Sequence, residues 1–359
     1  MRIMIVTDAW TPQINGVVRT LSALVGELRA AGQEVILVTP DRFRTLPCPT
    51  YPEIRLALLP GRRIARLIED TRPAAIHIAT EGPLGWAARN YCVRHGLPHT
   101  TAYHTRFPEY VRARFGVPLA LSYAVVRRFH AAAETMMVAT QSVEDDLRAR
   151  GFGRIRRWSR GVDTRLFRPG LRPVYDLPRP IFLYVGRLAV EKNVEAFLSL
   201  DLPGSKVAVG DGPQAAELKR RFPDVLFPGL KRGEELAAHY ADADVFVFPS
   251  RTDTFGLVLL EALASGLPVA AYPVAGPLDV LGGSPAGRLD SDLGKAAREA
   301  LAIPRELCRR AAESFSWSAS ARQFLDNLAP FDWNRLTSPA YPELVLFQHA
   351  LGDGGGSGL

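Results

Sequence analysis

Short β-branched runs alternate with amphipathic stretches along the first half of the chain. Residues 2–6 form a continuous apolar run that is typical of a buried strand. After a loop, the apolar positions from Val18 to Leu28 recur on one helical face, and Gly32 suits the end of that helix. Further strands are predicted at residues 34–39, 74–79, 99–103 and 135–140. A helix is predicted near residues 84–95, between the second and third of these strands. Strands that alternate with helices form a parallel sheet covered on both faces, so the pattern predicts an α/β fold.

The same pattern restarts in the second half. Strands are predicted there at residues 181–186, 206–210, 225–227, 244–249 and 268–272. The proline-dense residues 169–180 are expected to be an interdomain linker. We therefore expect an N-terminal domain over residues 1–170, a C-terminal domain over residues 171–330 that ends in a helix at residues 316–328, and a tail over residues 331–359. Two such units place the carboxyl ends of their strands around a shared crevice, where ligands of open α/β sheets bind.

Composition narrows the class of protein. Of the 359 residues, 47% are apolar and 23% are charged, which is ordinary for globular domains. The chain has no run of 18 or more apolar residues, and its N-terminus lacks the segments of a signal peptide. We therefore expect a cytoplasmic protein without a membrane-spanning helix. Cys48, Cys92 and Cys308 are far apart in the sequence, which favours incidental thiols over a disulfide framework or a zinc site.

Charge is distributed unevenly between the two halves. Residues 1–170 hold 25 Arg, no Lys and 14 acidic residues, whereas residues 171–359 hold 19 basic and 23 acidic residues. The basic first half suggests an anionic partner, such as a membrane surface or a nucleic acid. No recognised nucleic-acid motif accompanies it, so we expect no nucleic-acid partner. An arginine-rich coding bias explains the absence of Lys but not the difference in sign.

Residues 250–266, SRTDTFGLVLLEALASG, are the strongest local signal of a binding site. They follow a predicted strand and begin a helix near Phe255. The backbone N–H groups at Thr254, Phe255 and Gly256 are therefore expected to point into the crevice, as helix N-termini do when they bind phosphate.

Two acids stand in the same segment, eight positions apart. Asp253 is expected at or before the start of that helix and Glu261 two turns within it, so that the two carboxylates bracket one face of this element. Asp253 could equally be an N-cap. Glu261 stands between Leu260 and Ala262, where a carboxylate needs a partner, and a ribose diol offers two donors.

In each half, the loop after the first strand is a further candidate for ligand binding. In residues 185–193, VGRLAVEKN, Arg187 and Lys192 lie in a strand-to-helix turn where a diphosphate would be held, although isolated basic residues in a turn are usually solvated. In residues 11–19, Gly16 allows the backbone to approach a ligand closely. The dinucleotide fingerprint G-x-G-x-x-G is absent, which argues against an NAD-dependent dehydrogenase.

Together these segments resemble the family 4 retaining glycosyltransferases of the GT-B fold, over roughly residues 1–330. The resemblance implies two Rossmann-like α/β domains whose parallel sheets face a central crevice. The family's paired acids, Glu-x7-Glu, stand here as Asp253 and Glu261. By the resemblance, Glu261 binds the nucleotide ribose and Asp253 contacts hydroxyls of the donor sugar. Because Asp is one methylene shorter than Glu, this departure bears on the identity of the sugar more than on the reaction.

Other residues of the family pattern follow in order. Arg187 and Lys192 match the diphosphate pair, and Gly16 matches the glycine of the N-terminal loop. His104 matches the active-site histidine beside the donor sugar, whereas without the resemblance it would pass for a surface residue. The segments GDGP and RGVD match further landmarks, except that Arg160 stands where many members have Asn.

The stretches around residues 103–110 and 158–169 look most like the subgroup that glycosylates diacylglycerol. That subgroup uses UDP-glucose, UDP-glucuronate, UDP-sulfoquinovose or GDP-mannose, and the likeness favours a UDP-sugar. Residues 115–126 form an apolar stretch that suits the headgroup region of an anionic membrane, or equally a buried helix of the first domain. The cations that flank it are Arg106, Arg112, Arg114, Arg127 and Arg128.

The expected protein is thus a retaining hexosyltransferase that transfers a hexose or hexuronic acid to a lipid, as a peripheral protein on the inner face of the membrane. Its expected catalytic residues are His104, Asp253, Arg187 and Lys192. We expect no cofactor and no metal, because the cations and the helix terminus suffice to stabilise the leaving diphosphate. The acidic runs at residues 242–244 and 290–292 are interpreted as turns. The alternatives are a GDP-mannose-dependent or soluble-acceptor glycosyltransferase and a non-catalytic nucleotide-sugar-binding protein.

Overall fold

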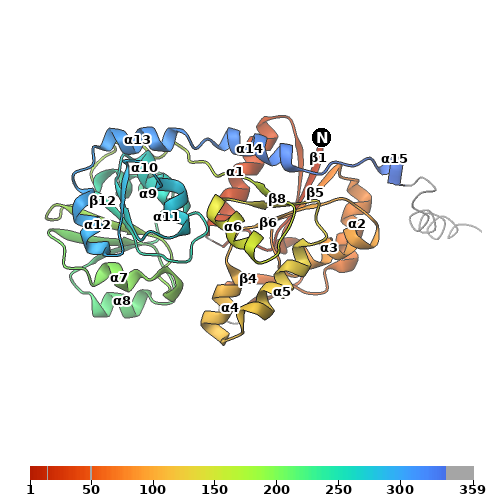
Figure 1. The fold of residues 1–359 in the computed structure, drawn as a ribbon, viewed down its shortest axis with the longest axis horizontal. Helices are drawn as coiled ribbons and strands as arrows, with labels where there is room; N and C mark the ends of the chain where they lie inside the picture. Colours follow the sequence, from red (N-terminus) through yellow and green to blue (C-terminus); the bar gives the residue numbers. More distant parts are fainter. Residues whose placement is uncertain (14, 49–50, 337–359) are drawn as a thin grey trace, which may run out of the picture.

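The computed structural model describes residues 1–13, 15–48 and 51–336, and residues 337–359 of the expected tail lie outside them. It shows two α/β domains side by side (Figure 1). The first has a six-stranded parallel sheet in the order β2-β1-β5-β6-β7-β8. Its strands are β1 (Arg2–Val6), β2 (Glu34–Val38), β5 (Ala75–Ile78), β6 (Thr100–Tyr103), β7 (Thr135–Val138) and β8 (Ile155–Arg157). An antiparallel hairpin, β3 (Thr45–Cys48) and β4 (Tyr51–Ala57), stands apart from this sheet.

The inner strand β1 of the first sheet is covered on both faces. Met4 packs in one cluster of buried residues and Ile3 in another, so alternate residues of β1 serve opposite layers. The continuous apolar run in the sequence is therefore the signature of a strand inside a three-layer domain. The helices of this domain are α1 (Gly16–Ala30), α2 (Gly61–Thr71), α3 (Pro83–Arg94), α4 (Phe107–Phe115), α5 (Leu119–His130) and α6 (Gln141–Ala149).

The second domain repeats this architecture with the strand order β11-β10-β9-β12-β13-β14. Its strands are β9 (Ile181–Val185), β10 (Ser205–Val209), β11 (Leu226–Gly229), β12 (Val245–Phe248), β13 (Val269–Ala271) and β14 (Gly287–Leu289). The helices after them are α7 (Val194–Leu198), α8 (Ala215–Arg221), α9 (Gly233–Asp242), α10 (Leu257–Ala264), α11 (Ala275–Leu281), α12 (Leu293–Ala300) and α13 (Arg305–Glu313). The predicted α/β alternation is confirmed in both halves. The hairpin and the short strands β8 and β14 were not predicted, because they have no long apolar run.

The last long helix departs from the expected domain boundary. Helix α14 (Trp317–Asn327) was expected in the second domain. Its Phe324 instead packs with Leu21 and Leu24 of α1 in the first domain. The chain crosses back between the domains through α13 and α14 (Figure 1). The short helix α15 (Trp333–Leu336) also lies on the first domain, where Trp333 Nε1 donates to Pro73 O at 2.8 Å. Helical periodicity shows that one face is buried, but it does not say which domain covers that face.

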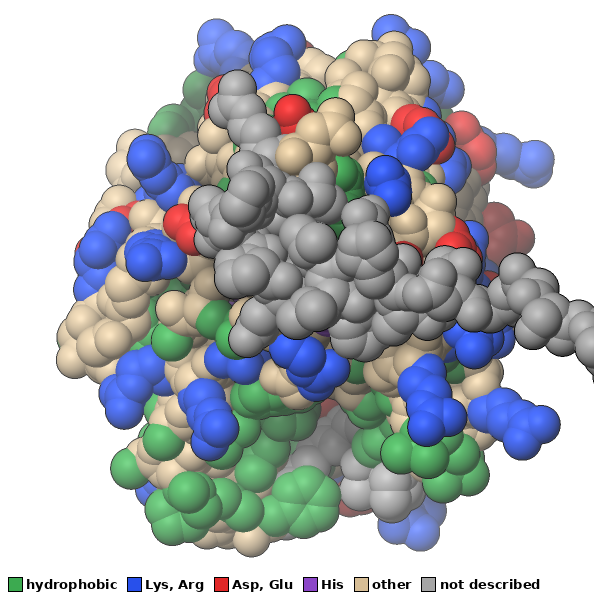
Figure 2. Space-filling model, turned by 90° about the vertical axis from the view of Figure 1, so that its right-hand side faces the viewer, with side chains coloured by type: hydrophobic (Ala, Val, Ile, Leu, Met, Phe, Trp, Pro, Cys, Tyr) green, Lys and Arg blue, Asp and Glu red, His purple; other side chains and the backbone are tan. Residues whose placement is uncertain are grey.

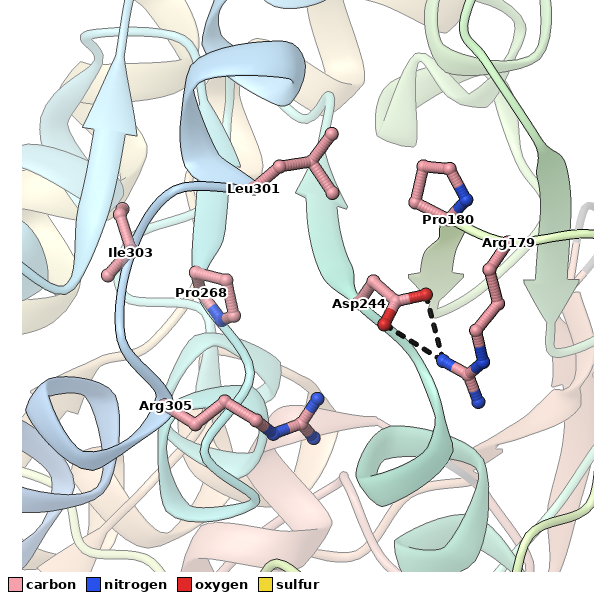
Figure 3. Close-up of a pocket in the computed structure, with 7 residues that line it drawn as sticks. All are labelled: Arg179, Pro180, Asp244, Pro268, Leu301, Ile303 and Arg305. Carbon is pink, nitrogen blue, oxygen red and sulfur yellow. Dashed lines mark hydrogen bonds and ion pairs between the residues drawn. The ribbon is translucent and has the colours of Figure 1, made fainter.

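The predicted linker is held by the acidic run at residues 242–244. Asp242 Oδ2 accepts hydrogen bonds from the backbone N–H groups of Val174 and Tyr175 at 2.7 and 2.8 Å. Arg179 pairs with both Asp242 and Asp244. Figure 3 shows this arginine beside a cavity of about 400 Å³ at the amino ends of β9, β12 and β13. The cavity lies at the sheet edge opposite to the one where the expected site residues gather.

Candidate active site

The loops that follow the carboxyl ends of the strands in the two sheets meet between the domains. We call the region between these loops the crevice. Thr254, after β12, donates from Oγ1 to the backbone oxygen of His104, after β6, at 2.7 Å. Thr140, after β7, donates to the backbone oxygen of Thr254 at 3.4 Å, and Ser142 N donates to Asp279 Oδ1 at 3.2 Å. Parallel strands all end at the same edge of a sheet, so these contacts bring the two ligand-binding edges together.

Lys192 and Asp253 form an ion pair inside this crevice. Lys192 ends a 3₁₀ turn after β9, and Asp253 lies in the loop between β12 and α10. Burial alone would lower the pKa of the Lys192 ammonium, but the charge of Asp253 and the hydroxyls of Tyr110 and Tyr184 hold this pKa above its usual range. The other carboxylate oxygen, Asp253 Oδ2, is buried and has no hydrogen-bond partner among the described residues. The pair therefore keeps a cation in the crevice and leaves one acceptor open.

Glycines shape the turn that carries Arg187. The backbone oxygen of Arg187 accepts a hydrogen bond from the Tyr184 hydroxyl at 2.8 Å. A Cβ on Gly210 would lie 1.9 Å from the backbone oxygen of Gly186. The GDGP segment after β10 therefore packs directly on the backbone of this turn, which only glycine permits.

Glu261 is almost fully buried, at 6% exposure, and both of its carboxylate oxygens have partners. Oε2 accepts from the Tyr240 hydroxyl at 2.9 Å, and Oε1 pairs with Arg19 of α1. Burial raises the pKa of Glu261, and the charge of Arg19 and the bond from Tyr240 counteract this rise. Arg19 stands one turn after Gly16 in the first domain, so the ion pair crosses the crevice at the residue expected to bind ribose.

Asp253 lies before the helix that carries Glu261, as one of its two expected positions, but this helix starts later than expected. The helix begins at Leu257 rather than near Phe255, so Asp253 precedes it and only Glu261 lies within it. The physical reason is Gly256, whose φ of 83° lies in the left-handed region and separates the loop from the helix. No described side chain caps α10, so its first N–H groups remain able to bind an anion.

The side chains of Phe255 and Thr254, two other expected donor residues, are engaged within the protein. The Phe255 ring is buried in the core of the second domain, and the Thr254 hydroxyl is taken by His104. Gly16 begins α1 opposite α10, where a Cβ would lie 3.9 Å from Leu257. The Asn15 side chain already caps α1, since its Oδ1 accepts from two backbone N–H groups at 3.0 Å. A side chain therefore caps the N-terminus of α1, whereas the N-terminus of α10 lacks a side-chain cap among the described residues.

His104 lies in the same crevice and is held by Arg160. Arg160 Nη2 is 3.1 Å from His104 Nδ1. Burial, followed by the charge of Arg160, holds the pKa of His104 well below its ordinary value, so the imidazole is neutral at pH 7. His104 Nε2 is buried and finds no partner in the part of the chain that the structure describes.

The basic and apolar residues expected at a membrane lie on α4 and α5, at the lower end of the first domain in Figure 1. One face of α5 is buried through Tyr123 and Val126, which matches the interpretation as a core helix. The other side of the helix pair α4 and α5 exposes large apolar side chains. Figure 2 shows hydrophobic side chains gathered at that end of the first domain, with Lys and Arg around them. The exposed apolar residues are Phe107 (55%), Phe115 (65%), Leu121 (60%) and Val125 (50%). We call these four residues and the arginines between them the α4–α5 face.

The five expected membrane arginines differ in their surroundings. Arg112, Arg127 and Arg128 are exposed. Arg106 is instead tied to Asp146 at 3.2 Å, with only 19% of its side chain exposed. Arg114 lies in α4, and its side chain is outside the described part of the structure.

Sequence reasoning missed three residues at the site: Arg19, Tyr110 and Tyr240. Tyr110 belongs to α4. Burial raises the pKa of its hydroxyl, while the charge of Lys192 lowers it and that of Asp253 raises it. Helix α4 therefore places Tyr110 within electrostatic range of the Lys192–Asp253 pair and exposes Phe107 and Phe115 to solvent. The only signal for Arg19 was its position one helical turn after Gly16. Nothing in the local sequence marked Tyr110, because its contacts cross the domain boundary.

Two observations complete the description of the site. Among the described residues, no group of three or more His, Cys, Asp or Glu side chains is arranged to hold a metal ion. No helix in the described ranges has the length and apolarity needed to cross a membrane.

Comparison with family models agrees with this architecture. Residues 14–166 match the model described as Glycosyltransferase Family 4, and residues 179–301 match the one described as Glycosyl transferases group 1. Among solved structures, the sucrose-phosphate synthase of Thermosynechococcus elongatus superposes with a TM-score of 0.73 at 21% identity. That match covers 96% of this chain and 99% of the other.

Curated relatives are similar over most of the chain. A GDP-mannose-dependent alpha-mannosyltransferase of Mycobacterium tuberculosis is 32% identical over 78% of this chain and 81% of its own length. A sulfoquinovosyl transferase of Arabidopsis thaliana is 33% identical over 75% of this chain and 58% of its own length. An alpha-monoglucosyldiacylglycerol synthase of Streptococcus pneumoniae is 26% identical over 76% of this chain and 71% of its own length.

Proposed function

Since the chain belongs to the family 4 glycosyltransferases and has their GT-B fold, we propose that it transfers a hexose from a nucleotide sugar to a lipid acceptor at a membrane surface, with retention of anomeric configuration. The enzyme class and the fold agree with the expectation from the sequence. The proposal adds the acceptor, the stereochemistry and the roles of individual residues.

The observation that carries the proposal is the placement of α4. Its Tyr110 is near enough to the Lys192–Asp253 pair for their charges to shift the pKa of its hydroxyl, and its Phe107 and Phe115 are exposed to solvent. A lipid surface that binds the α4–α5 face would thus lie one helix diameter, about 10 Å, from the donor site. Exposed apolar side chains among arginines suit the interface of an anionic membrane. The monoglucosyldiacylglycerol synthase among the relatives points to the same class of acceptor.

The donor half of the site suits a nucleoside diphosphate sugar. Glu261 would accept from the ribose hydroxyls once Arg19 gives way, while Arg187, Lys192 and the uncapped N-terminus of α10 would bind the diphosphate. When Lys192 turns to the diphosphate, Asp253 gains a free carboxylate for hydroxyls of the sugar. The ion pairs of the crevice are in this way exchanged for contacts with the donor.

In the proposed reaction, the acceptor hydroxyl attacks the anomeric carbon from the face that the diphosphate leaves. The bond from that carbon to the diphosphate oxygen breaks with its electron pair on the oxygen, and the departing oxygen takes the acceptor proton. The transition state resembles an oxocarbenium ion, and no protein nucleophile takes part. The residues contribute orientation and stabilisation of the leaving charge, and closure of the two domains excludes water as a competing acceptor.

The test is radiolabelled transfer from a panel of donors, with and without diacylglycerol in anionic vesicles. UDP-glucose and UDP-glucuronate are favoured by the sequence resemblance, and GDP-mannose is included because the mycobacterial relative is named for it. Vesicle-dependent label in lipid is the expected result. Label only on soluble acceptors would overturn the lipid acceptor but keep the transferase. Nucleotide binding without turnover of any donor would instead favour a binding protein.

A further inference from the structure

Arg160, the residue that departs from the Asn of many family members, lies beside the active-site histidine. It is 4% exposed. Its Nη1 donates to the backbone oxygens of Trp158 at 2.6 Å and Ser159 at 3.2 Å, and its Nη2 lies 3.1 Å from His104 Nδ1. Burial lowers its pKa to about 9, which still leaves the guanidinium charged at pH 7.

The contact between Arg160 and His104 decides where the imidazole carries its proton. A guanidinium has five donors and no acceptor, so Nη2 donates and His104 Nδ1 accepts. The same charge, together with burial, keeps the ring of His104 neutral. A neutral imidazole whose Nδ1 accepts carries its single proton on Nε2.

That Nε2–H group is buried and lacks a partner among the described residues. The backbone oxygen of His104 is bonded to Thr254, whose neighbour Asp253 also has a buried oxygen without a described partner. One loop thus offers a donor and the other an acceptor, and a single hydrogen bond joins the two loops. Buried polar groups in this state are expected where a ligand supplies the missing bonds.

We propose that Arg160 is a positioning residue that holds His104 as a neutral Nε2–H donor to a hydroxyl of the bound sugar. His104 therefore does not act as a general base, because its one lone pair, on Nδ1, is occupied by Arg160. The sugar as occupant rests on the proposed function, whereas the protonated nitrogen is a property of the chain itself.

Arg160 packs on Trp158, which is in turn held by helix α14. Its guanidinium carbon lies 4.2 Å from the centre of the Trp158 ring, and Trp158 Nε1 donates to Ser320 of α14 at 3.0 Å. A Cβ on Gly161 would lie 2.4 Å from the backbone nitrogen of Trp317. The RGVD segment therefore combines an arginine that orients His104 with a glycine that lets α14 pack closely. The return of α14 to the first domain supports the active site through Trp158.

The first test reads the ring nitrogens directly and needs no activity. In ¹⁵N spectra of histidine-labelled protein at pH 7, the signals of His104 are identified by their loss in His104→Gln. We expect a protonated Nε2 and a bare Nδ1, and a mixture of the two neutral tautomers in Arg160→Met. A His104 that is protonated on Nδ1 in the wild type overturns the proposal, whether or not the chain transfers sugar.

The second test separates positioning from mere support of the fold. Gln places an amide donor close to the position of Nε2 and has no tautomers, so Arg160→Met should matter less in a His104→Gln background. We expect Arg160→Met to lower kcat/KM about tenfold or more in the wild type and less than about twofold in His104→Gln. Arg160→Lys, which keeps a donor-only cation, should lose less than Arg160→Met. The exposed Arg165→Met serves as the matched control, and thermal unfolding is recorded for each variant. Equal losses in both backgrounds would show a purely structural role and overturn the proposal.

Discussion

The two sides of the crevice hold charge in different ways. On the second-domain side, Lys192 is paired with Asp253, and Glu261 is paired with Tyr240 and Arg19. On the first-domain side, His104 is neutral and Arg160 is buried without a described carboxylate beside it. Farther out, this side exposes the α4–α5 face.

Under the proposed function, this difference separates recognition of the donor from recognition of the acceptor. The paired charges would exchange partners when a nucleoside diphosphate enters, and backbone and ion pairs would fix the geometry of the donor. Neutral donors and an exposed apolar face impose no such geometry and suit hydroxyls and a lipid surface. The following predictions test this difference between the two sides of the crevice.

The largest effect is expected on the charged side. Lys192→Ala removes a cation from the leaving diphosphate and should lower kcat/KM about 100-fold or more. Steady-state transfer measures this loss, and the exposed Lys219→Ala, which carries the same charge change on α8, is the control. Because the substitution also leaves Asp253 unpaired, thermal unfolding is measured in parallel. A loss no larger than that of Lys219→Ala would remove Lys192 from the donor site.

The buried neutral histidines of the first domain should make the free energy of unfolding depend on pH. Burial lowers the pKa of His77 to about 3, and the pKa of His104 is also lowered. In the unfolded chain both rings take up protons near pH 6.5, so the unfolded state binds more protons below that pH. The stabilisation is complete above about pH 6.5 and falls as the pH drops, by about 2 kcal/mol for His77 at pH 5, and His104 changes stability in the same direction. Urea unfolding at pH 5 and pH 7.5 should show a smaller difference in His77→Gln than in the wild type. The same difference in both would mean that His77 is protonated in the folded protein.

The α4–α5 face predicts a loss that depends on the membrane. Phe115→Ser combined with Leu121→Ser removes two exposed apolar side chains and should lower transfer to lipid in anionic vesicles about tenfold. Transfer to a short-chain soluble acceptor should not change. Leu226→Ser, an exposed position on β11 of the second domain, is the control. Equal transfer by the double variant and the control would assign membrane contact to another surface.

The smallest effect is expected where the two sides touch. Arg19 pairs with Glu261 but is 35% exposed, so solvent screens much of this attraction. A nucleotide that binds Glu261 must displace it, and Arg19→Ala should therefore tighten nucleotide binding by about two- to fivefold. Isothermal titration with UDP and GDP measures this change, with Arg29→Ala at the far end of α1 as the control. Weaker binding in Arg19→Ala would instead make Arg19 a direct ligand of the donor.

Much of the fold followed from local patterns. The apolar runs at residues 2–6 and 181–186 each predicted a buried inner strand of a sheet, because a strand covered on both faces has no polar alternation. Glu261 stood out for the same reason, as a carboxylate in an otherwise apolar helix. The hairpin at residues 45–57 was missed, since its strands lie outside both main sheets and carry mixed residues.

Resemblance to a family placed the site residues in one crevice, but it did not place their partners. The helix of Glu261 was expected to begin near Phe255, whereas Gly256 delays it to Leu257 and leaves Asp253 in the loop beside Lys192. Tyr110 carried no signal at all, because its role depends on a helix of one domain lying against a loop of the other.

The sequence by itself determined the two α/β units, the linker between them and the family whose residues line the crevice. These features are written in periodicity, in glycine positions and in short motifs, all of which act over a few neighbouring residues. The tertiary structure alone decided that α14 returns to the first domain, that Arg19 meets Glu261, and that Arg160 meets His104. Each of these contacts joins residues more than 50 positions apart, and the preferences of neighbouring residues carry no information about such pairs.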